Sequence, residues 1–370
     1  MNIREKIVLF IAPLPPPIDG QSKASGMALQ AMRNSDYLVK AVNLNRSSLN
    51  RSFGSQINRV LEVFFIFLKI AVGARRSELI YISLSESLLG NFKDLVIYCI
   101  LFRKLDRVTL HMLGGTGMNV ILNERPFLSK INGFFMRRMS KVLVEGSRGH
   151  RIFEKYFNAN QIYTIPNFVD DHLISSESSI IDKFTRSKKI QILYLSNMLP
   201  GKGYLDLFEA FVGLPDSAKE RLVLKFVGGF SSTSDREHFL SLILGYPNIE
   251  YLGSFIDGDE KKALYMNSHV FCLPTYYPYE GQPISILEAY ATGCVVLTTQ
   301  HAGIPDIFAE NVNGYVVSSR NPESIRRSII KVLNDLDAAR DIALRNANEA
   351  HSKYQSSTFR ANFINAIKNN

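Results

Sequence analysis

Residues 270–306 read VFCLPTYYPYEGQPISILEAYATGCVVLTTQHAGIPD, a stretch in which a strand, a helix and a second strand follow one another. The apolar runs at 270–273 and 295–298 are short, which predicts buried strands. Pro283 stands between them at a suitable first position for a helix. Strands that alternate with helices in this way are typical of a parallel sheet.

The same alternation extends over nearly the whole chain. Strands are predicted at 7–12, 37–44, 79–82, 108–112, 142–144 and 162–165, and again at 190–195, 223–227, 249–252, 270–273, 295–298 and 315–317. Each set of six resembles a complete Rossmann-like unit, and a length of 370 residues favours two domains. The predicted fold class is therefore α/β, with two Rossmann-like domains.

The boundary between the domains is predicted in a polar stretch, residues 170–189, which is rich in Ser and Lys and has no sustained period. Residues 1–170 then form the N-terminal domain, and residues 171–355 form the C-terminal domain. The segment 322–370 contains no strand candidate and is expected to be helical. Its last part, 356–370, is a helix able to pack back on the N-terminal domain.

The composition is that of a globular protein, with 46% hydrophobic and 21% charged residues and a mean hydropathy near zero. These values argue against a disordered chain and against a protein with many membrane spans. The three cysteines, Cys99, Cys272 and Cys294, have no C-x-x-C spacing, so neither a disulfide framework nor a zinc ribbon is predicted. Without the apolar core of a signal peptide near residue 1, we expect a cytoplasmic protein.

Positive charge is concentrated in the first half of the chain. Residues 1–150 hold 21 Lys and Arg against 10 Asp and Glu, a net charge of +11, whereas residues 151–370 hold 22 against 24, a net charge of −2. Such a field suits an anionic membrane surface, a nucleic acid or a phosphorylated substrate. A nucleic-acid binder would need a recognition helix, a zinc module or aromatic residues along a sheet, so we expect no nucleic-acid partner.

The most apolar window, residues 60–72, is interrupted by Glu62 and Lys69 and is shorter than the roughly 20 residues that a spanning helix needs. It is flanked by Arg59, Arg75 and Arg76. A basic amphipathic helix at a membrane surface has this pattern, and so does a helix that covers a sheet. A second basic and aromatic stretch, 125–141, favours a pair of surface helices that face anionic lipid.

Two candidate ligand positions lie in the first half. Gly20, in the loop 13–22 after the first strand, precedes a helix whose N-terminus suits a phosphate, although an ordinary loop capped by Ser22 fits equally well. His111 ends the strand 108–112, at the edge of the sheet where ligands bind in open α/β folds. A structural histidine is the alternative there.

The second half contains two further candidate segments. Lys202, within Pro-Gly-Lys-Gly at a helix start, combines a cation with a helix dipole, as a pyrophosphate site requires; a solvated lysine is the alternative. Glu280 and Glu288 stand on either side of a Gly-Gln-Pro turn, and could accept hydrogen bonds from the hydroxyl groups of a sugar and a ribose. Two solvated glutamates would have the same spacing.

These segments together resemble the family-4 glycosyltransferases. The E-x7-E spacing of Glu280 and Glu288 and the nearly forty residues around it carry the resemblance, and 17–20, His111-x-x-Gly114, 165–170 and 200–203 agree with it in order. The resemblance implies a GT-B fold, with the active site in the cleft between two Rossmann-like domains. It also implies retaining transfer of a hexosyl group from a UDP- or GDP-linked sugar, with no metal and no other cofactor.

The resemblance also implies roles for single residues. Lys202 would neutralise the diphosphate, and Glu288 would hold the ribose hydroxyls. Glu280 would grip the transferred sugar, His111 would lie near the reacting carbon, and Gly20 would lie beside the phosphates. The donor would also contact the residues Ser196, Gly281, Gln282, Pro283 and Ile284, the last four through the start of a helix.

The chain departs from the family at Ser196 and Asn197, where an arginine is usual. Losing that arginine removes one fork of donors from the diphosphate clamp. Lys23 or a main-chain nest is a candidate substitute. For this reason a catalytically weak, nucleotide-sugar-binding subunit of a glycosylation complex is the alternative to a transferase.

The expected acceptor is a glycan linked to a polyprenyl diphosphate, in the biosynthesis of a surface polysaccharide. The basic first half and the window 60–72 are the basis of this expectation, because a lipid-linked acceptor is presented at a membrane. The N-terminal domain would then be the acceptor side and would bind the inner face of the membrane peripherally, while the C-terminal domain would bind the nucleotide sugar.

Overall fold

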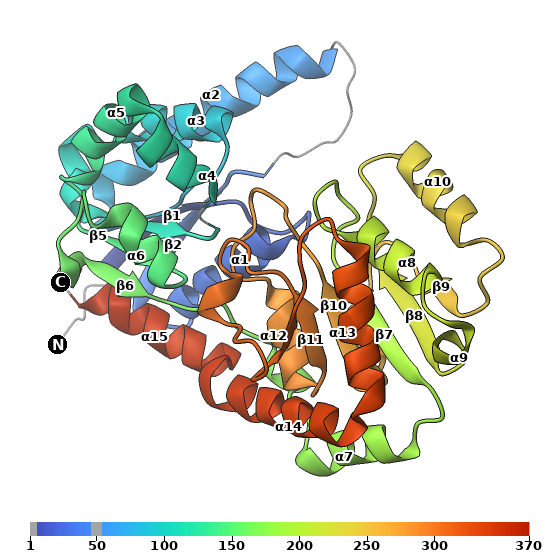
Figure 1. The fold of residues 1–370 in the computed structure, drawn as a ribbon. Helices are drawn as coiled ribbons and strands as arrows, with labels where there is room; N and C mark the ends of the chain where they lie inside the picture. The colour runs from blue at the N-terminus through green and yellow to red at the C-terminus, as the bar shows by residue number, and fades with distance from the viewer. Residues whose placement is uncertain (1–5, 46–53, 115, 370) are drawn as a thin grey trace. The chain divides into compact units, whose positions relative to one another are not determined.

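The computed structural model describes residues 6–45, 54–114 and 116–369 (Figure 1). The chain forms two compact units: unit 1 comprises Met1–Asn167 and Ser357–Asn370, and unit 2 comprises Phe168–Ser356. The divisions thus lie at 167/168 and 356/357, where the sequence predicted 170/171 and 355/356. Each unit is built on one sheet of six parallel strands.

The sheet of unit 1 has the strand order β2-β1-β3-β4-β5-β6. All of its pairings are parallel. Its strands are β1 (Lys6–Ala12), β2 (Tyr37–Asn43), β3 (Leu79–Ser83), β4 (Val108–Met112), β5 (Lys141–Val144) and β6 (Ile162–Thr164). The helices that flank them are α1 (Gly20–Arg33), α2 (Gly54–Arg76), α3 (Leu88–Ile100), α4 (Thr116–Asn119), α5 (Pro126–Met136), α6 (Ser147–Phe153) and the C-terminal α15 (Ser356–Lys368), with the short helices η1 (Phe102–Arg107), η2 (Val120–Glu124) and η3 (Ala159–Gln161).

The C-terminal helix α15 is attached to the sheet of unit 1 by both apolar and polar contacts. The ring of Phe363 packs edge-on against Tyr81 on β3, with their centroids 5.8 Å apart. At the end of the helix, Lys141 Nζ donates a hydrogen bond to the carbonyl of Ala366 at 2.9 Å. A charged donor at a helix C-terminus forms hydrogen bonds with carbonyl groups that have no partner within the helix.

The sheet of unit 2 has the order β12-β11-β10-β7-β8-β9, which is the strand order of a Rossmann fold, and its pairings are parallel. The strands are β7 (Ile190–Leu195), β8 (Leu222–Val227), β9 (Ile249–Tyr251), β10 (Val270–Leu273), β11 (Val295–Thr298) and β12 (Gly314–Val316). The helices are α7 (Glu177–Arg186), α8 (Tyr204–Val212), α9 (Asp216–Lys219), α10 (Thr233–Ile243), α11 (Gly258–Met266), α12 (Ile284–Ala291), α13 (Pro322–Asn334) and α14 (Leu336–Lys353), with the short helices η4 (Asp171–Leu173) and η5 (Ile304–Asp306).

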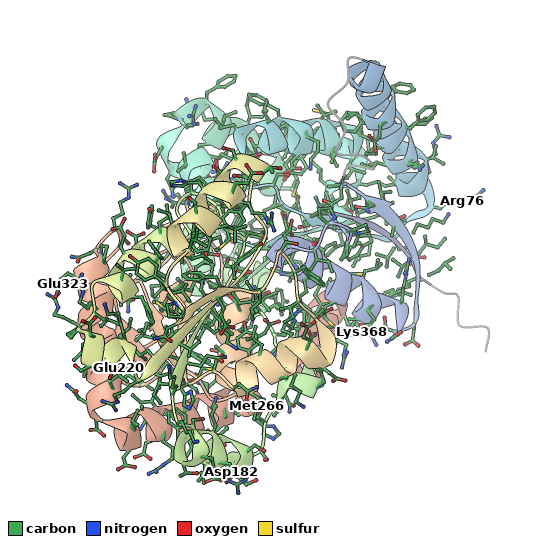
Figure 2. The ribbon with its side chains drawn as sticks, turned by 90° about the vertical axis from the view of Figure 1, so that its right-hand side faces the viewer. Arg76, Asp182, Glu220, Met266, Glu323 and Lys368 are labelled. Carbon is green, nitrogen blue, oxygen red and sulfur yellow. The ribbon has the colours of Figure 1, made fainter. Side chains whose placement is uncertain are left out.

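The twelve predicted strands are all present, and their ends differ from the prediction by no more than one residue. The helical prediction for 322–370 is also confirmed over the described residues, as α13, α14 and α15. The apolar runs that predicted the strands supply many of the buried side chains of the two cores. Figure 2 shows the side chains on the ribbon of the chain. Parallel strands are buried on both faces, which is why such runs mark them clearly.

Two local predictions were wrong. The polar stretch 170–189 is not simply a link, because it contains α7, capped by Ser176 and anchored by the buried side chains of Ile180 and Phe184. Their spacing of four residues is one helical turn, but two apolar positions among polar residues gave no clear period. Pro283 precedes α12 as its N-cap instead of being its first residue.

Lys183 of α7 connects three helices in the interior of unit 2. Its ammonium group is buried and donates to the carbonyls of Ser268 at 2.8 Å, Thr292 at 2.7 Å and Gly293 at 2.6 Å. These carbonyls follow the C-termini of α11 and α12, where backbone acceptors lack helical partners. Burial lowers the pKa of Lys183, because removal from water disfavours the charged form. The three carbonyl groups accept the hydrogen bonds of the buried ammonium group.

We expect Lys183→Met to destabilise unit 2 by about 2–4 kcal/mol, because three buried carbonyls lose a charged donor. The free energy of unfolding, measured by urea denaturation and far-UV circular dichroism, tests this. Lys188→Met is the matched control, since Lys188 is exposed two residues beyond α7. Equal stability of the two variants would show that the buried ammonium group contributes nothing.

Candidate functional site

The candidate site lies where the strand order of unit 2 reverses. From β7 the chain adds β8 and β9 on one side, and β10, β11 and β12 on the other, so β7 and β10 are neighbours at the switch point. Loops that leave the carboxyl ends of two such strands diverge, and ligands of open α/β sheets bind between them. Lys202 follows β7, and Glu280 follows β10.

Lys202 and Glu280 form a buried ion pair. The ammonium Nζ lies 2.9 Å from Oε1 and 2.8 Å from Oε2 of Glu280, and the exposed fractions of the two side chains are 12% and 8%. Thr275 Oγ1 donates a further hydrogen bond to Oε2 at 2.8 Å, and Nζ lies 4.9 Å from the centroid of the Tyr277 ring. Both groups are therefore held in place and are not solvated surface charges.

Glycine residues allow the two loops to approach each other. Gly203 has φ +78°, and a Cβ atom there would lie 2.3 Å from the carbonyl oxygen of Pro274 on the opposite loop. The loops are further joined by a hydrogen bond of 2.7 Å from the amide of Tyr276 to the carbonyl of Gly201. Gly203 therefore fits here on two counts, positive φ and absence of a side chain.

Glu288 lies about one turn into α12 and is held by two groups from α11. Lys261 Nζ lies 3.0 Å from Oε1, and the hydroxyl of Tyr265 donates to Oε2 at 3.2 Å. Glu288 and Lys261 are both buried, so the alternative of a solvated glutamate is excluded. The sequence analysis did not find Lys261, because it belongs to no motif; its spacing of four residues from Tyr265 on one helix was the available signal.

The other residues of unit 2 that are predicted to contact the nucleotide sugar lie at the same edge of the sheet. Ser196 is half-buried directly after β7, and Gly281 and Gln282 lead into α12, which begins at Ile284. Pro283 has no N–H, so backbone donors from this run come from the other three residues. The contacts of these residues with a bound nucleotide sugar stay a prediction.

Gly20 and His111 belong to unit 1. Gly20 is the exposed first residue of α1, and a Cβ atom there would meet no protein atom within 4 Å. The cap of α1 is Asp19 and not Ser22: the Asp19 carboxylate accepts from the Ser22 amide at 2.7 Å, and the Ser22 hydroxyl accepts from the Asp19 amide at 2.9 Å. Packing within the protein thus does not require glycine at position 20.

His111 has no exposed surface. Its Nδ1 lies 2.6 Å from the hydroxyl of Tyr81, and its ring lies against Phe363 of α15 at 6.2 Å between centroids. Burial lowers the pKa of His111 to about 3, so the imidazole is neutral at physiological pH. In this structure it is a core residue of unit 1, and its predicted catalytic role stays a prediction.

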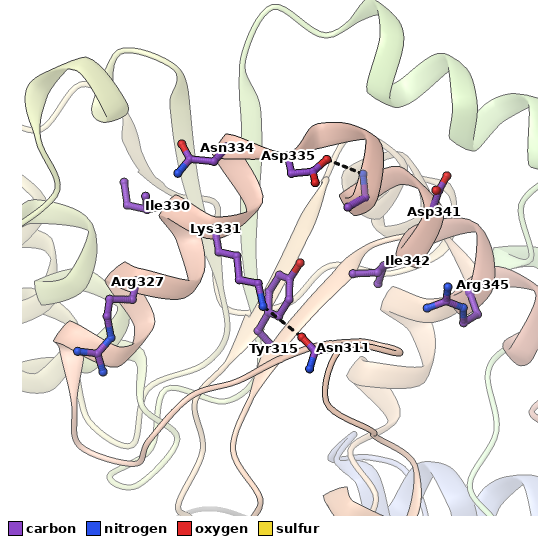
Figure 3. Close-up of a pocket in the computed structure, with 11 residues that line it drawn as sticks. Asn311, Tyr315, Arg327, Ile330, Lys331, Asn334, Asp335, Asp341, Ile342 and Arg345 are labelled. Carbon is purple, nitrogen blue, oxygen red and sulfur yellow. Dashed lines mark hydrogen bonds between the residues drawn. The ribbon is translucent and has the colours of Figure 1, made fainter.

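A separate pocket of about 650 Å³ lies on unit 2 between α13, α14 and the loop before β12 (Figure 3). There Lys331 Nζ donates to Asn311 Oδ1 at 3.1 Å and lies 4.0 Å from the ring centroid of Tyr315. Asp335 accepts from the amide of Ala338 at 2.9 Å as the N-cap of α14. None of the predicted site residues lines this pocket, and we assign it no part in the site.

Comparison with known proteins finds a family model that matches part of the chain and solved structures that share its fold. Residues 176–349, which make up most of unit 2, match the family model described as Glycosyl transferases group 1. Solved structures agree over nearly the whole chain: Anabaena HepE in complex with UDP has a TM-score of 0.73 at 16% identity and covers 98% of this chain and 99% of its own. WaaG, a glycosyltransferase involved in lipopolysaccharide biosynthesis, has a TM-score of 0.66 at 14% identity, covering 98% and 100%. The fold is therefore GT-B, as the sequence predicted.

Curated relatives are more similar in sequence, but over a smaller part of the chain. An uncharacterized glycosyltransferase of Methanocaldococcus jannaschii is 24% identical over 226 residues, which cover 57% of this chain and 56% of that protein. The O-antigen chain mannosyltransferase B of Escherichia coli is 22% identical over 57% and 58%. The N,N'-diacetylbacillosaminyl-diphospho-undecaprenol alpha-1,3-N-acetylgalactosaminyltransferase of Campylobacter jejuni is 26% identical over 60% and 54%. The chain spans about half the length of the curated relatives it matches.

A double-mutant cycle tests the Lys202–Glu280 pair. We expect Lys202→Met to lower the free energy of unfolding by about 2–4 kcal/mol, because it leaves the Glu280 carboxylate buried without its cation. Adding Glu280→Gln removes that charge, so the double variant should be more stable than Lys202→Met alone. Urea denaturation of the wild type, both single variants and the double variant measures the coupling. Strictly additive losses would mean that the two side chains do not interact in solution.

Proposed function

We propose that this chain is a retaining glycosyltransferase that moves a hexosyl group from a UDP- or GDP-linked sugar to a glycan acceptor in polysaccharide biosynthesis. The observation that carries the proposal is the placement of Lys202, Glu280 and Glu288 at the switch point of the unit 2 sheet, within the segment that matches the glycosyltransferase family. Lys202 pairs with Glu280, and Glu288 is a second carboxylate on the helix that follows; a cation and two carboxylates are the groups that a diphosphate, a sugar and a ribose require. The proposal involves no metal and no other cofactor.

Binding of the donor would change the partner of Lys202. In this structure the charge of Lys202 is balanced by Glu280, at 2.8 Å. A diphosphate carries more negative charge than one carboxylate, so Lys202 would turn to it and Glu280 would become available for sugar hydroxyls. The amides of Gly281, Gln282 and Ile284 would add donors at the positive end of α12.

The transfer itself would proceed on one face of the sugar. The acceptor oxygen forms a bond to the anomeric carbon while the bond from that carbon to the diphosphate oxygen breaks, and the acceptor proton passes to the leaving phosphate. Lys202 and the start of α12 would stabilise the charge that develops on the diphosphate, which is usually the largest contribution in such a site. With Ser196 in place of an arginine, Lys202 would be the main cation of this clamp, and the weak binding subunit remains the second candidate function.

The donor is tested by thermal shift with UDP, GDP, their hexose derivatives and the free nucleosides, because a ligand of the folded state raises the melting temperature. We expect one diphosphate series to stabilise the wild type. Lys202→Met should lower the affinity for the nucleoside diphosphate at least about tenfold and leave the affinity for the nucleoside nearly unchanged. Only the diphosphate carries the negative charge that the lysine ammonium group binds.

Slow hydrolysis of the bound sugar nucleotide separates the two candidate functions in the same samples. A transferase should leak sugar to water, whereas a binding subunit should bind without turnover. If Lys202→Met lowers the affinities for the nucleoside and the nucleoside diphosphate equally, or if no nucleotide binds the wild type, the assignment of the site is wrong.

For the acceptor we propose a glycan linked to a polyprenyl diphosphate. The Campylobacter relative is named for such an acceptor, a diphospho-undecaprenol-linked saccharide. The first half of this chain carries a net charge of +11, which suits an anionic membrane on which a lipid-linked substrate is presented. Among the described residues, no helix is long and apolar enough to cross a membrane.

The surface proposed to meet the membrane is an apolar helix face in unit 1, where α2, α3, η1 and α5 pack together (Figure 1). We define it by the exposed side chains of Phe64, Phe65, Leu68 and Val72 on α2, Leu89, Phe92 and Val96 on α3, Phe102 on η1, and Phe127 and Phe134 on α5. Arg75 and Arg76 are exposed at the end of α2, where Figure 2 marks Arg76. Apolar side chains bordered by exposed cations are typical of an interfacial helix.

The window 60–72 lies in α2, which has a buried face and an exposed apolar face as far as its side chains are described. Ile70 and Ala74 are buried toward the sheet, while Phe64, Phe65 and Val72 are exposed. The side chains of Arg59 and of residues 60 and 61 lie outside the described residues. The helix thus covers the sheet with one face and presents an apolar face to its surroundings.

Co-sedimentation with vesicles tests the membrane proposal. The wild type should pellet with vesicles that contain anionic lipid, and less at high salt, because each basic residue near such a surface contributes about 1 kcal/mol. Arg75→Glu with Arg76→Glu should release it, and so should Phe64→Ser with Phe65→Ser, through loss of apolar insertion.

The matched control is Arg186→Glu with Lys188→Glu on unit 2, which makes the same change of charge on an exposed surface and should leave binding unchanged. A wild type that stays in the supernatant with anionic vesicles at low salt contradicts the membrane proposal, and the basic half would then serve a soluble phosphorylated acceptor.

A further inference from the structure

Helix α11 presents two polar groups to the carboxylate of Glu288. Lys261 and Tyr265 are four residues apart, so they lie on one face of the helix. Lys261 Nζ binds Oε1 at 3.0 Å, and the Tyr265 hydroxyl binds Oε2 at 3.2 Å. The Tyr265 hydroxyl is also 3.2 Å from the carbonyl oxygen of Ser285 and shares its one proton, so Lys261 is the stronger of the two groups that fix the plane and position of the carboxylate.

The burial of Lys261 is unusual for a residue that serves stability alone. Its side chain is 8% exposed and that of Glu288 is 5% exposed, so both charges have left water. Replacing such a pair by apolar side chains of similar size often leaves a protein equally or more stable, because the desolvation cost of the charges disappears. An apolar residue on α11 could cover the same part of the core without that cost, so packing does not account for a charged group here.

Lys261 is also bound from its own helix. Asp257 Oδ1, one turn earlier at the N-cap of α11, lies 3.3 Å from Nζ. The ammonium group is thus placed between two carboxylates, one 58% exposed and one 5% exposed. This arrangement holds Nζ at the buried carboxylate and restricts the rotamers of the long lysine side chain.

We propose that Lys261 is a positioning residue that holds Glu288 for a cis-diol, and that it thereby gives the site its selectivity for ribonucleotides. The inference rests on the proposed function, in which Glu288 accepts the ribose hydroxyls. A carboxylate accepts about two hydrogen bonds at each oxygen. With Lys261 on Oε1 and Tyr265 on Oε2, the carboxylate is oriented to accept one ribose hydroxyl at each oxygen. Lys261 itself acts through Glu288.

The measurement is the ratio of dissociation constants for the 2'-deoxy and the ribo form of the same nucleoside diphosphate, by titration calorimetry. UDP and 2'-deoxy-UDP are used, or the guanosine pair if GDP stabilises the wild type in the thermal-shift screen. We expect the wild type to prefer the ribo form at least about tenfold, since a site built to bind a hydroxyl rejects the analogue that lacks it. Lys261→Met should weaken the ribo form and bring the ratio close to one, and Lys261→Arg should restore most of the preference.

Lys262→Met is the matched control, a lysine beside Lys261 on the same helix that is only half-buried and should leave the ratio unchanged. Tyr265→Phe provides a second, uncharged change that removes the donor to Oε2 and should lower the ratio in part. If Lys261→Met does not fold, Lys261→Gln removes the cation but keeps a hydrogen-bond donor beside Oε1, and it should lower the ratio while leaving Glu288 in place.

The outcomes separate this inference from the proposed function. A Lys261→Met protein that melts at a lower temperature but keeps the wild-type ratio would show that Lys261 is structural, and the inference would be wrong while the proposed function stands. A wild type that binds nucleoside diphosphates without preferring ribose overturns the inference and the ribose role of Glu288, while the diphosphate role of Lys202 stands. A wild type that binds no nucleoside diphosphate overturns both.

Discussion

The ion pair between Lys202 and Glu280 fixes the two loops on which the candidate site is built. The residues are 78 positions apart, and they meet only because β7 and β10 are neighbours at the centre of the unit 2 sheet. Gly203 lets the loops touch through their backbones, and Thr275 holds the carboxylate from the other side. A change in strand order, in the glycine or in either charge would separate groups that the proposed chemistry needs together.

The fold could be predicted from the sequence because buried parallel strands consist of short apolar runs. This signal predicted all twelve strands. Helix α7 was missed for the opposite reason. Its core contacts depend on Ile180 and Phe184 and on the buried ammonium of Lys183, a residue that composition counts as polar. Only the tertiary structure shows that three carbonyl groups surround that lysine.

The candidate site could be predicted in part. Lys202, Glu280 and Glu288 could be singled out as candidates because they follow strands or stand in a motif, but the pairing of Lys202 with Glu280 depends on strand order, which the sequence does not state. Lys261 had no motif, and its significance appears only once α11 lies against α12. His111 shows the converse limit: its position at a strand end was predicted correctly, but the strand turns its ring into the core beneath Phe363.

The two units use charge in different ways. Near the site of unit 2 the cations are buried and paired, as Lys202 is with Glu280 and Lys261 with Glu288. In unit 1 Arg75 and Arg76 are exposed beside apolar side chains. A buried cation acts over one hydrogen bond and is little affected by salt, whereas an exposed one attracts over about 8 Å at physiological ionic strength. The first arrangement suits stereochemical recognition of one small molecule, and the second suits attraction to an extended anionic surface. The proposed donor and the proposed membrane-bound acceptor have these two sets of requirements.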